Sequence, residues 1–233
     1  MDKYCIIAGG GRLPSIIKNL LINKDHEVFI IGIKNNFDSS KFSKKSFEEV
    51  KIGSIGKILK ILKNKNIKNI IFAGSIKRPN FGDISLDYEA IKLLRHTKIT
   101  SYGDNALFKK IALYFEVKGF KFVEWYKYFP NLFTKDDILT IHKPTKKAIQ
   151  NLQKGLSVYK CFSKSDVGQS LIIQNNLILG LEAIEGTDKL IKRFFFYKRK
   201  SDKGILIKLK KYNQDLRFDL PTIGINTLKL LKK

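Results

Sequence analysis

Two loops in the first half of the chain carry residue types suited to holding phosphate groups. Gly9, Gly10 and Gly11 separate an apolar run from a stretch with helical periodicity. Glycines at such a place let phosphates approach the backbone, and the unpaired N–H groups of a helix N-terminus favour an anion. Ser75 and Arg78 follow another apolar run, at the carboxyl end of a predicted strand, where open parallel sheets bind ligands. The alternative is a tight glycine turn and an exposed surface loop, without a ligand.

Oxygen-bearing side chains near predicted helix starts are candidates for phosphate or metal chemistry. Asp104, Thr187 and Asp219 each come just before or at such a start, where a side-chain oxygen commonly caps the helix. Thr187 and Asp188 together could hold a phosphate through hydroxyl and backbone N–H groups. Capping alone explains these residues nearly as well. With two cysteines and three histidines at unsuitable spacings, the chain predicts no zinc site, so a catalytic metal would be a hard ion such as Mg²⁺.

The elements that must position the first set of residues alternate between strands and helices. Strands are predicted at residues 3–8, 28–33, 50–52, 69–73 and near 122, and helices at residues 13–21, 55–62 and 105–118. This alternation predicts a parallel sheet with helices on its faces. We therefore expect an α/β protein whose residues 1–130 form a Rossmann-like amino-terminal domain.

The dinucleotide-binding fingerprint of Rossmann domains is incomplete here. Pro14 stands at the third glycine position, and Gly32 to Lys34 end the second strand where an acidic residue would bind the ribose. We therefore do not expect an NAD-dependent dehydrogenase.

A break in periodicity at residues 126–135, around Pro130, predicts a domain boundary. Residues 131–233 are expected to form a second, smaller α/β domain with helices at 145–159, from Thr187 and from about Pro221, and strands at 170–174, 177–182 and 204–208. Asn175 and Asn176 accept positive φ and predict a hairpin between the first two strands. By strand alternation, Glu182 and Ile184 share one face and Ala183 and Glu185 the other, so one of the two carboxylates is expected on the covered side of the sheet.

The charge of +24 suggests nucleic acid as a partner, but the composition argues against it. Of the 45 basic residues, 39 are lysines, the bias expected of AT-rich codons, and residues 1–130 and 131–233 each carry +12. Nucleic-acid-binding proteins usually depend on arginine forks. We keep a basic nucleic-acid-binding protein only as an alternative. No apolar run approaches the ~20 residues of a membrane-spanning helix, so we expect a cytoplasmic protein.

Six segments together resemble the LpxI family of UDP-2,3-diacylglucosamine pyrophosphatases. In chain order they are IAGGGRLP at residues 7–14, FAGSIKRPNF at 72–81, GDNAL at 103–107, DVGQS at 166–170, LEAIEGTD at 181–188 and DLPTIG at 219–224. The resemblance implies a two-domain hydrolase that binds its lipid-linked sugar nucleotide between a Rossmann-like domain and a carboxyl-terminal α/β domain. It also implies a Mg²⁺-dependent attack of water on the pyrophosphate, releasing UMP and 2,3-diacylglucosamine 1-phosphate for lipid A synthesis.

The resemblance assigns roles to residues of the six segments. It implies that Asp219 is catalytic and that Asp219 and Asp104 hold the metal. Substrate contacts are expected from Gly10, Gly11, Ser75, Arg78, Asp104, Gln169, Gly186, Thr187 and Asp188. Asn105 stands where the family usually has a second aspartate, and relatives continue past the DLPTIG helix. We therefore expect a truncated sequence or a reduced domain, and an inactive lipid or nucleotide carrier of the same fold is the alternative.

A basic and aromatic segment follows in the second domain. Residues 192–211 contain nine basic residues and one acidic residue, Asp202, with aromatic side chains at 194–197. Aromatic rings beside cations suit the headgroup region of an anionic leaflet, which predicts transient contact with the inner-membrane surface. The alternative is that the rings belong to the core and the lysines form a solvated rim.

Overall fold

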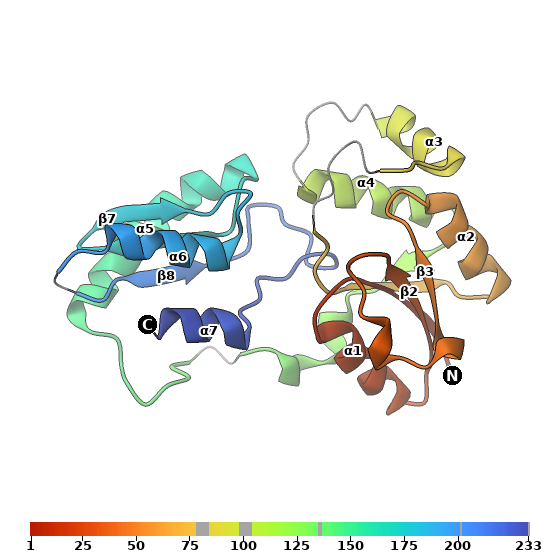
Figure 1. The fold of residues 1–233 in the computed structure, drawn as a ribbon, viewed down its shortest axis with the longest axis horizontal. Coiled ribbons are helices and arrows are strands. Elements are labelled where there is room, and N and C mark those ends of the chain that lie inside the picture. The colour runs from red at the N-terminus through yellow and green to blue at the C-terminus, as the bar shows by residue number, and fades with distance from the viewer. Residues whose placement is uncertain (78–83, 98–103, 135–136, 201, 233) are drawn as a thin grey trace. The chain divides into compact units, whose positions relative to one another are not determined.

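The computed structural model describes residues 1–77, 84–97, 104–134, 137–200 and 202–232 (Figure 1). The chain divides into two compact units. Unit 1 comprises Met1–Tyr102 and Ala106–Pro130, and unit 2 comprises Gly103–Asn105 and Asn131–Lys233. Each unit has its own sheet, which confirms the expected α/β class.

Unit 1 is built on a parallel sheet of five strands in the order β3-β2-β1-β4-β5. Its strands are β1 (Lys3–Ala8), β2 (Glu27–Ile33), β3 (Phe47–Val50), β4 (Asn69–Ala73) and β5 (Lys121–Phe122). In the central register, Ile7 of β1 lies beside Ile31 of β2 and Phe72 of β4. The three central strands, β2, β1 and β4, are mostly apolar, as expected where helices cover both faces of a parallel sheet.

Helices accompany this sheet in unit 1 (Figure 1). They are α1 (Leu13–Ile22), α2 (Ile55–Asn64), α3 (Tyr88–Thr97) and α4 (Asp104–Val117). In α2 the buried side chains recur at helical spacing, as in Ile58, Leu59 and Leu62. In α4, Phe115 packs edge-on against Phe122 of β5, with 5.7 Å between ring centroids.

Two elements of unit 1 differ from expectation. Strand β3 begins at Phe47, three residues before the predicted strand. It ends at Val50, which is buried, because Gly53, at φ +88°, then turns the chain towards α2. Helix α3 was not expected. Asp87 caps it by accepting a hydrogen bond from Ala90 N (2.9 Å), and its other oxygen accepts one from Gly56 N (2.7 Å).

Unit 2 contains an antiparallel sheet in the order β7-β6-β8. Its strands are β6 (Ser170–Gln174), β7 (Leu177–Leu181) and β8 (Ile205–Lys208). Asn175 and Asn176 connect β6 to β7 with φ of 51° and 59°, which confirms the predicted hairpin.

Helices cover both faces of this sheet. Helix α5 (Lys146–Phe162) packs on one face, and α6 (Thr187–Tyr197) with α7 (Ile225–Leu231) packs on the other. The first core contains Tyr159, Leu171, Ile173 and Ile207. The second contains Ile172, Leu190, Ile191 and Phe194. Strand alternation divides β6 between the two cores, because Leu171 and Ile173 point one way and Ile172 the other.

The predicted start of α6 at Thr187 is confirmed, whereas its predicted cap and the predicted start of α7 are corrected. Helix α6 takes Gly186, at φ +79°, as its N-cap, so Thr187 is its first residue and makes no side-chain cap. Helix α7 begins at Ile225 rather than near Pro221, after an extended Gly224. The described 3-10 helices are η1 (Ser39–Lys41), η2 (Lys44–Ser46), η4 (Trp125–Tyr128), η5 (Pro130–Leu132) and η6 (Ser163–Ser165). In the described ranges, no helix has the length and apolarity to cross a membrane.

Candidate functional site

The loops after β1 and β4 meet at the carboxyl edge of the unit 1 sheet. β1 and β4 are parallel neighbours, and the strand order reverses direction between them, which is where open α/β sheets bind ligands. Gly10 N donates a hydrogen bond to Ser75 O (2.7 Å), and Ser75 N donates to Gly10 O (3.0 Å). The structure therefore brings together two of the residues predicted to contact substrate.

The glycines of these loops serve different purposes. A Cβ on Gly9 would overlap the carbonyl oxygen of Ser75, so the close approach of the two loops requires this glycine. A Cβ on Gly10 would lie 3.1 Å from Asn36 O and 3.3 Å from Ser75 Oγ, which is tight. Gly11 has φ +93°, and a Cβ there would meet nothing within 4 Å. Gly11 is exposed and keeps its backbone accessible at the start of α1.

A third loop, after β2, supports the same edge of the sheet. Asn36 Oδ1 accepts a hydrogen bond from Lys77 N (2.7 Å), so the β2 and β4 loops are joined by a side chain that the sequence did not single out. Arg78, the predicted substrate-binding arginine of the β4 loop, lies outside the described residues.

The hydroxyl of Thr187 is the centre of a polar cluster in unit 2. Its Oγ1 donates to Glu182 Oε1 (3.0 Å) and accepts a hydrogen bond from Lys208 Nζ (2.7 Å). Ser170 Oγ lies 3.3 Å from the same atom. Glu182 is the carboxylate of its segment that is buried, and the cluster compensates its charge with a cation and hydroxyl groups.

Gln169 lies next to this cluster. Its backbone N donates to Glu182 Oε2 (3.4 Å). Within the part of the chain that the structure describes, Gln169 Oε1 is buried and has no hydrogen-bond partner. Buried acceptors are nearly always satisfied in proteins, so this oxygen is suited to accept a hydrogen bond from a ligand.

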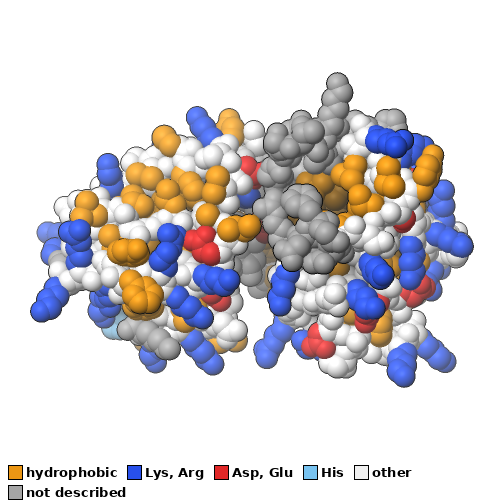
Figure 2. All heavy atoms as spheres, turned by 45° about the horizontal axis from the view of Figure 1, so that its top comes forward, with side chains coloured by type: hydrophobic (Ala, Val, Ile, Leu, Met, Phe, Trp, Pro, Cys, Tyr) orange, Lys and Arg blue, Asp and Glu red, His pale blue; other side chains and the backbone are white. Residues whose placement is uncertain are grey.

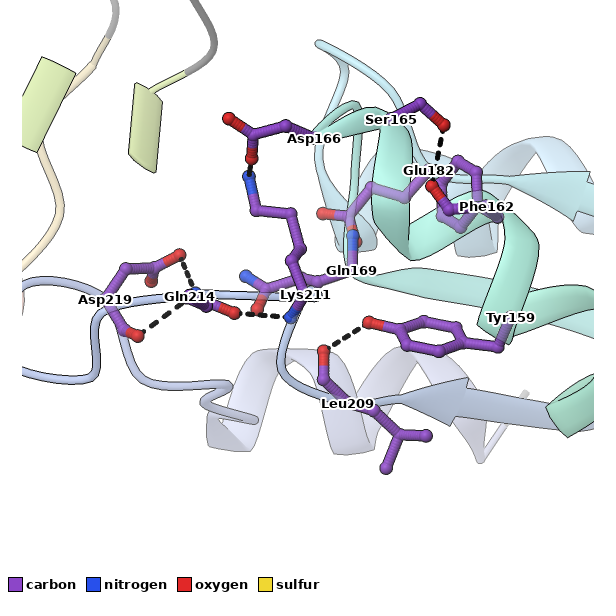
Figure 3. Close-up of polar contacts among 10 residues, drawn as sticks. All are labelled: Tyr159, Phe162, Ser165, Asp166, Gln169, Glu182, Leu209, Lys211, Gln214 and Asp219. Carbon is purple, nitrogen blue, oxygen red and sulfur yellow. Dashed lines mark hydrogen bonds and ion pairs between the residues drawn. The ribbon is translucent and has the colours of Figure 1, made fainter. Parts of the chain in front are cut away.

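Asp219 is held by a chain of polar contacts rather than by a helix start (Figure 3). Gln214 Nε2 donates to Asp219 Oδ2 (2.6 Å) and to Asp219 O (3.0 Å), and Gln214 Oε1 accepts from Lys211 N (2.6 Å). Lys211 Nζ forms an ion pair with Asp166 Oδ1 at 2.6 Å. Because α7 starts at Ile225, capping does not explain Asp219.

Asp188 and Gly186 occupy the start of α6. Asp188 Oδ1 accepts a hydrogen bond from Thr227 Oγ1 (2.6 Å), which ties α6 to α7. This contact gives Asp188 a structural role in addition to its predicted one. Gly186 has the positive φ that favours glycine, and a Cβ there would meet nothing within 4 Å.

Tyr159 is excluded as a general base. Its hydroxyl donates to Leu209 O (2.5 Å) at the edge of the α5 core (Figure 3). Burial, together with the charge of Glu182, raises the pKa of Tyr159 to about 12. The phenol therefore stays protonated at neutral pH and acts as a hydrogen-bond donor.

The carboxylates predicted to hold Mg²⁺ are only partly described. Asp104 begins α4, and its side chain lies outside the described residues. Across the described residues, no three His, Cys, Asp or Glu side chains gather where they could hold a metal ion. Mg²⁺ is commonly bound through one or two carboxylates together with substrate phosphates, so Asp219 suits it as one protein ligand.

Sequence reasoning missed Asn36, Lys208, Lys211 and Gln214. Strand alternation carried a signal for Lys208, because Leu206, two residues earlier in β8, faces the α6 core. Lysines are so frequent in this chain that neither Lys208 nor Lys211 stood out. Nothing local marks Gln214, whose partners are fixed by the loop conformation.

Both halves of the chain match models of known domains. The LpxI N-terminal domain matches residues 3–132, and the LpxI C-terminal domain matches residues 135–233. The chain is also 28% identical over 235 aligned residues to the UDP-2,3-diacylglucosamine pyrophosphatase LpxI of Caulobacter vibrioides. This alignment covers 98% of the chain and 84% of the relative.

Proposed function

Because the chain belongs to the LpxI family, we propose that it hydrolyses the pyrophosphate bond of UDP-2,3-diacylglucosamine. The products would be UMP and 2,3-diacylglucosamine 1-phosphate, an intermediate for lipid A synthesis. The observation that carries this proposal is the match of both domain models, supported by the curated relative of that name.

The loops of unit 1 are suited to bind the phosphates of the nucleotide. Gly10 N is bonded to Ser75 O, so the backbone N–H groups proposed to meet a phosphate are those that follow it at the N-terminus of α1, where the helix dipole also favours an anion. Ser75 belongs to the neighbouring loop and is exposed. Since these contacts come from the backbone, they need loops in which no side chain stands between the N–H groups and the phosphates.

The polar groups of unit 2 are suited to the chemical step. One water molecule forms a new P–O bond while the P–O–P bridge breaks, and the water gives up a proton. We propose that the Asp219 carboxylate accepts this proton or holds Mg²⁺, with Gln214 fixing its orientation. Mg²⁺, when bound, supplies positive charge to the pyrophosphate oxygens.

Gln169 and Thr187 are proposed to contact the same substrate. Gln169 Oε1 offers a buried acceptor, and Lys208 Nζ brings a positive charge to within 2.7 Å of Thr187 Oγ1. A cation in this position favours an anionic group of a ligand.

The test is to incubate the purified full chain with UDP-2,3-diacylglucosamine and to measure UMP over time, with Mg²⁺ and with EDTA. We expect UMP to be released in the presence of Mg²⁺ and no UMP to be released in the presence of EDTA. No UMP from a folded preparation would contradict the proposal, and tight substrate binding without turnover would indicate a carrier.

The two roles of Asp219 give different results in one titration. If Asp219 holds the ion, Asp219→Glu raises the Mg²⁺ concentration needed for half-maximal rate. If it accepts the proton, that concentration stays unchanged while the rate falls.

A further inference from the structure

The outward side of α6 combines an exposed aromatic ring with cations. Phe196 is 86% exposed, although Leu190, Ile191 and Phe194 of the same helix are buried. Lys192 and Arg193 precede Phe196 by four and three residues and so share its face of the helix. Arg193 forms an ion pair with Glu185 (2.6 Å), whereas Lys192 is exposed on the same helix face as Phe196.

The chain that follows α6 extends this surface. Tyr197 is 57% exposed and Phe195 is 36% exposed, with Lys198 Nζ 5.8 Å from the Phe195 ring centroid. Arg199, Lys200 and Lys203 are exposed as well. We call this set the aromatic–basic surface: Lys192, Phe195, Phe196, Tyr197, Lys198, Arg199, Lys200 and Lys203.

A buried glutamine fixes the loop that carries these cations. Gln174 Nε2 donates to Arg199 O (2.8 Å) and to Asp202 O (2.5 Å), and Gln174 Oε1 accepts from Arg199 N (2.9 Å). Asp202 uses its carboxylate within the unit, accepting hydrogen bonds from Asn151 Nδ2 (2.8 Å) and Gly204 N (2.9 Å). The carboxylate of Asp202, the acidic residue of this segment, is therefore engaged in hydrogen bonds within unit 2. The lysines keep their positive charge on the surface.

The four aromatic side chains at residues 194–197 differ in exposure. Phe194 belongs to the α6 core, but the next three rings do not, so the core-and-rim interpretation holds for only one of the four. Exposed aromatic rings beside lysines match the headgroup region of a lipid bilayer, where rings insert and cations meet anionic lipids.

We propose that the aromatic–basic surface binds the anionic face of a lipid bilayer. Charge complementarity favours anionic lipids, and Phe196 provides an apolar group that enters the interface. The link to catalysis rests on the proposed function, because a substrate with two acyl chains must be taken from a bilayer. Binding to lipid is measured without substrate and can therefore fail or succeed independently of hydrolysis.

Nucleic acid is the competing occupant of a basic surface. On the face drawn in Figure 2, Lys and Arg side chains are spread over both units instead of gathering in one stripe. A site built for nucleic acid is expected to concentrate its cations along one face or groove. The exposed rings beside the cations of the aromatic–basic surface favour a bilayer interface, which accepts both apolar rings and positive charge.

The experiment measures cosedimentation of the full chain with phosphatidylcholine vesicles, with and without phosphatidylglycerol, at physiological ionic strength. The test variant replaces Lys192, Lys198, Lys200 and Lys203 with Gln. The control variant replaces Lys44, Lys45, Lys60 and Lys63 of unit 1, which are also exposed, and removes the same charge.

We expect the wild type to bind only the vesicles that contain phosphatidylglycerol. Each cation near the surface contributes up to about fivefold, so removing four should weaken binding by up to about 600-fold, and we expect a loss of at least about tenfold. The control variant should bind within about twofold of the wild type. No binding by the wild type, or an equal loss in both variants, would overturn the proposal.

A second pair of variants tests the ring. Phe196→Gln should weaken vesicle binding several-fold, whereas Tyr88→Gln in unit 1, which removes another highly exposed ring, should not. Equal effects of the two would contradict a role for Phe196. Duplex DNA that binds through the same four lysines and displaces the vesicles would assign the surface to nucleic acid and overturn the proposal.

The kinetic consequence is specific to substrate in vesicles. The four-lysine test variant should raise KM for vesicle-presented UDP-2,3-diacylglucosamine and leave KM for detergent-solubilised substrate unchanged. An equal rise in both would place these lysines in substrate binding and contradict a membrane-docking role.

Discussion

Unit 1 and unit 2 present polar atoms in different ways. At the carboxyl edge of the unit 1 sheet, Gly10 and Ser75 pair through main-chain atoms, and glycines keep other side chains away. In unit 2, Thr187 and Asp219 are each held by side chains, Lys208 in one case and Gln214 in the other. Because Gly10 N and Ser75 N already bond to each other's loop, we propose that unit 1 binds with the backbone N–H groups at the start of α1, while unit 2 places side chains that can exchange protons.

The difference also predicts how each unit responds to mutation. A backbone site is damaged by an added Cβ, whatever its chemistry, because the Cβ occupies the space of the ligand or of a neighbouring loop. A side-chain site is damaged by an isosteric change that removes charge or a donor. Catalytic groups act in the transition state, so their loss lowers kcat, whereas loss of uniform binding raises KM.

The largest effect is expected from Asp219→Asn, which keeps the shape of the side chain and removes its charge. We expect kcat to fall about 10²- to 10⁴-fold, the range that a general base contributes. Steady-state UMP release measures this change. A fall of less than about tenfold, equivalent to about 1.4 kcal/mol, would mean that Asp219 is not catalytic.

A smaller fall in kcat is expected from Gln214→Glu. The new side chain can still accept from Lys211 N, but it offers no N–H to Asp219 and places a second carboxylate beside it. We expect kcat to fall about tenfold with little change in KM. A nearby like charge raises the pKa of Asp219, so the acidic limb of the pH–rate profile should move to higher pH.

Gln150→Glu is the matched control for this change, since it adds the same charge at an exposed position of α5. It should leave kcat and the profile as in the wild type. An unshifted acidic limb in Gln214→Glu would contradict the positioning role of Gln214.

Gly10→Ala tests the backbone site of unit 1. The Cβ would lie 3.1 Å from Asn36 O and 3.3 Å from Ser75 Oγ, so the loops that meet here would have to shift. We expect KM to rise about tenfold, or about 1.4 kcal/mol, with kcat within about twofold of the wild type. Thermal unfolding should show a folded protein. A folded variant with unchanged KM would show that this loop does not contact the substrate.

The smallest effect is expected from Tyr159→Phe, which acts on stability. Removing the hydroxyl leaves Leu209 O without its donor and should lower the free energy of unfolding by about 1 kcal/mol at neutral pH. The pKa of Tyr159 is raised from 10.0 to about 12, so its contribution is complete below pH 10 and is lost as the pH rises towards 12.

Urea unfolding at several pH values checks this sign. The stability difference between the wild type and Tyr159→Phe should shrink from pH 10 to pH 12. A difference that stays constant over this range would contradict the raised pKa.

The sequence predicted most of the regular elements because their signals are local. Asn69–Ala73 is a continuous apolar run, and Asn175 with Asn176 tolerates the positive φ of a hairpin turn. The start of α7 was placed too early because Pro221 resembles a first-turn proline, whereas the chain stays extended to Gly224. Helix α3 was missed although Asp87 is a good cap, because its amphipathic pattern is short.

The site was less predictable because its contacts are long-range. Thr187 meets Lys208 across 21 residues, and Asn36 meets Lys77 across 41. Such pairs depend on sheet order and register, which a single sequence does not specify. Gly9 shows the same limit, because a glycine is required there by the carbonyl oxygen of Ser75, in a loop more than sixty residues away.

The most direct test of the division between the units is equilibrium binding of UDP, measured by isothermal titration calorimetry without Mg²⁺. The account predicts that Asp219→Asn binds UDP within about twofold of the wild type although it no longer turns over substrate, and that Gly10→Ala binds about tenfold more weakly. Loss of UDP binding in Asp219→Asn together with wild-type binding in Gly10→Ala would contradict it.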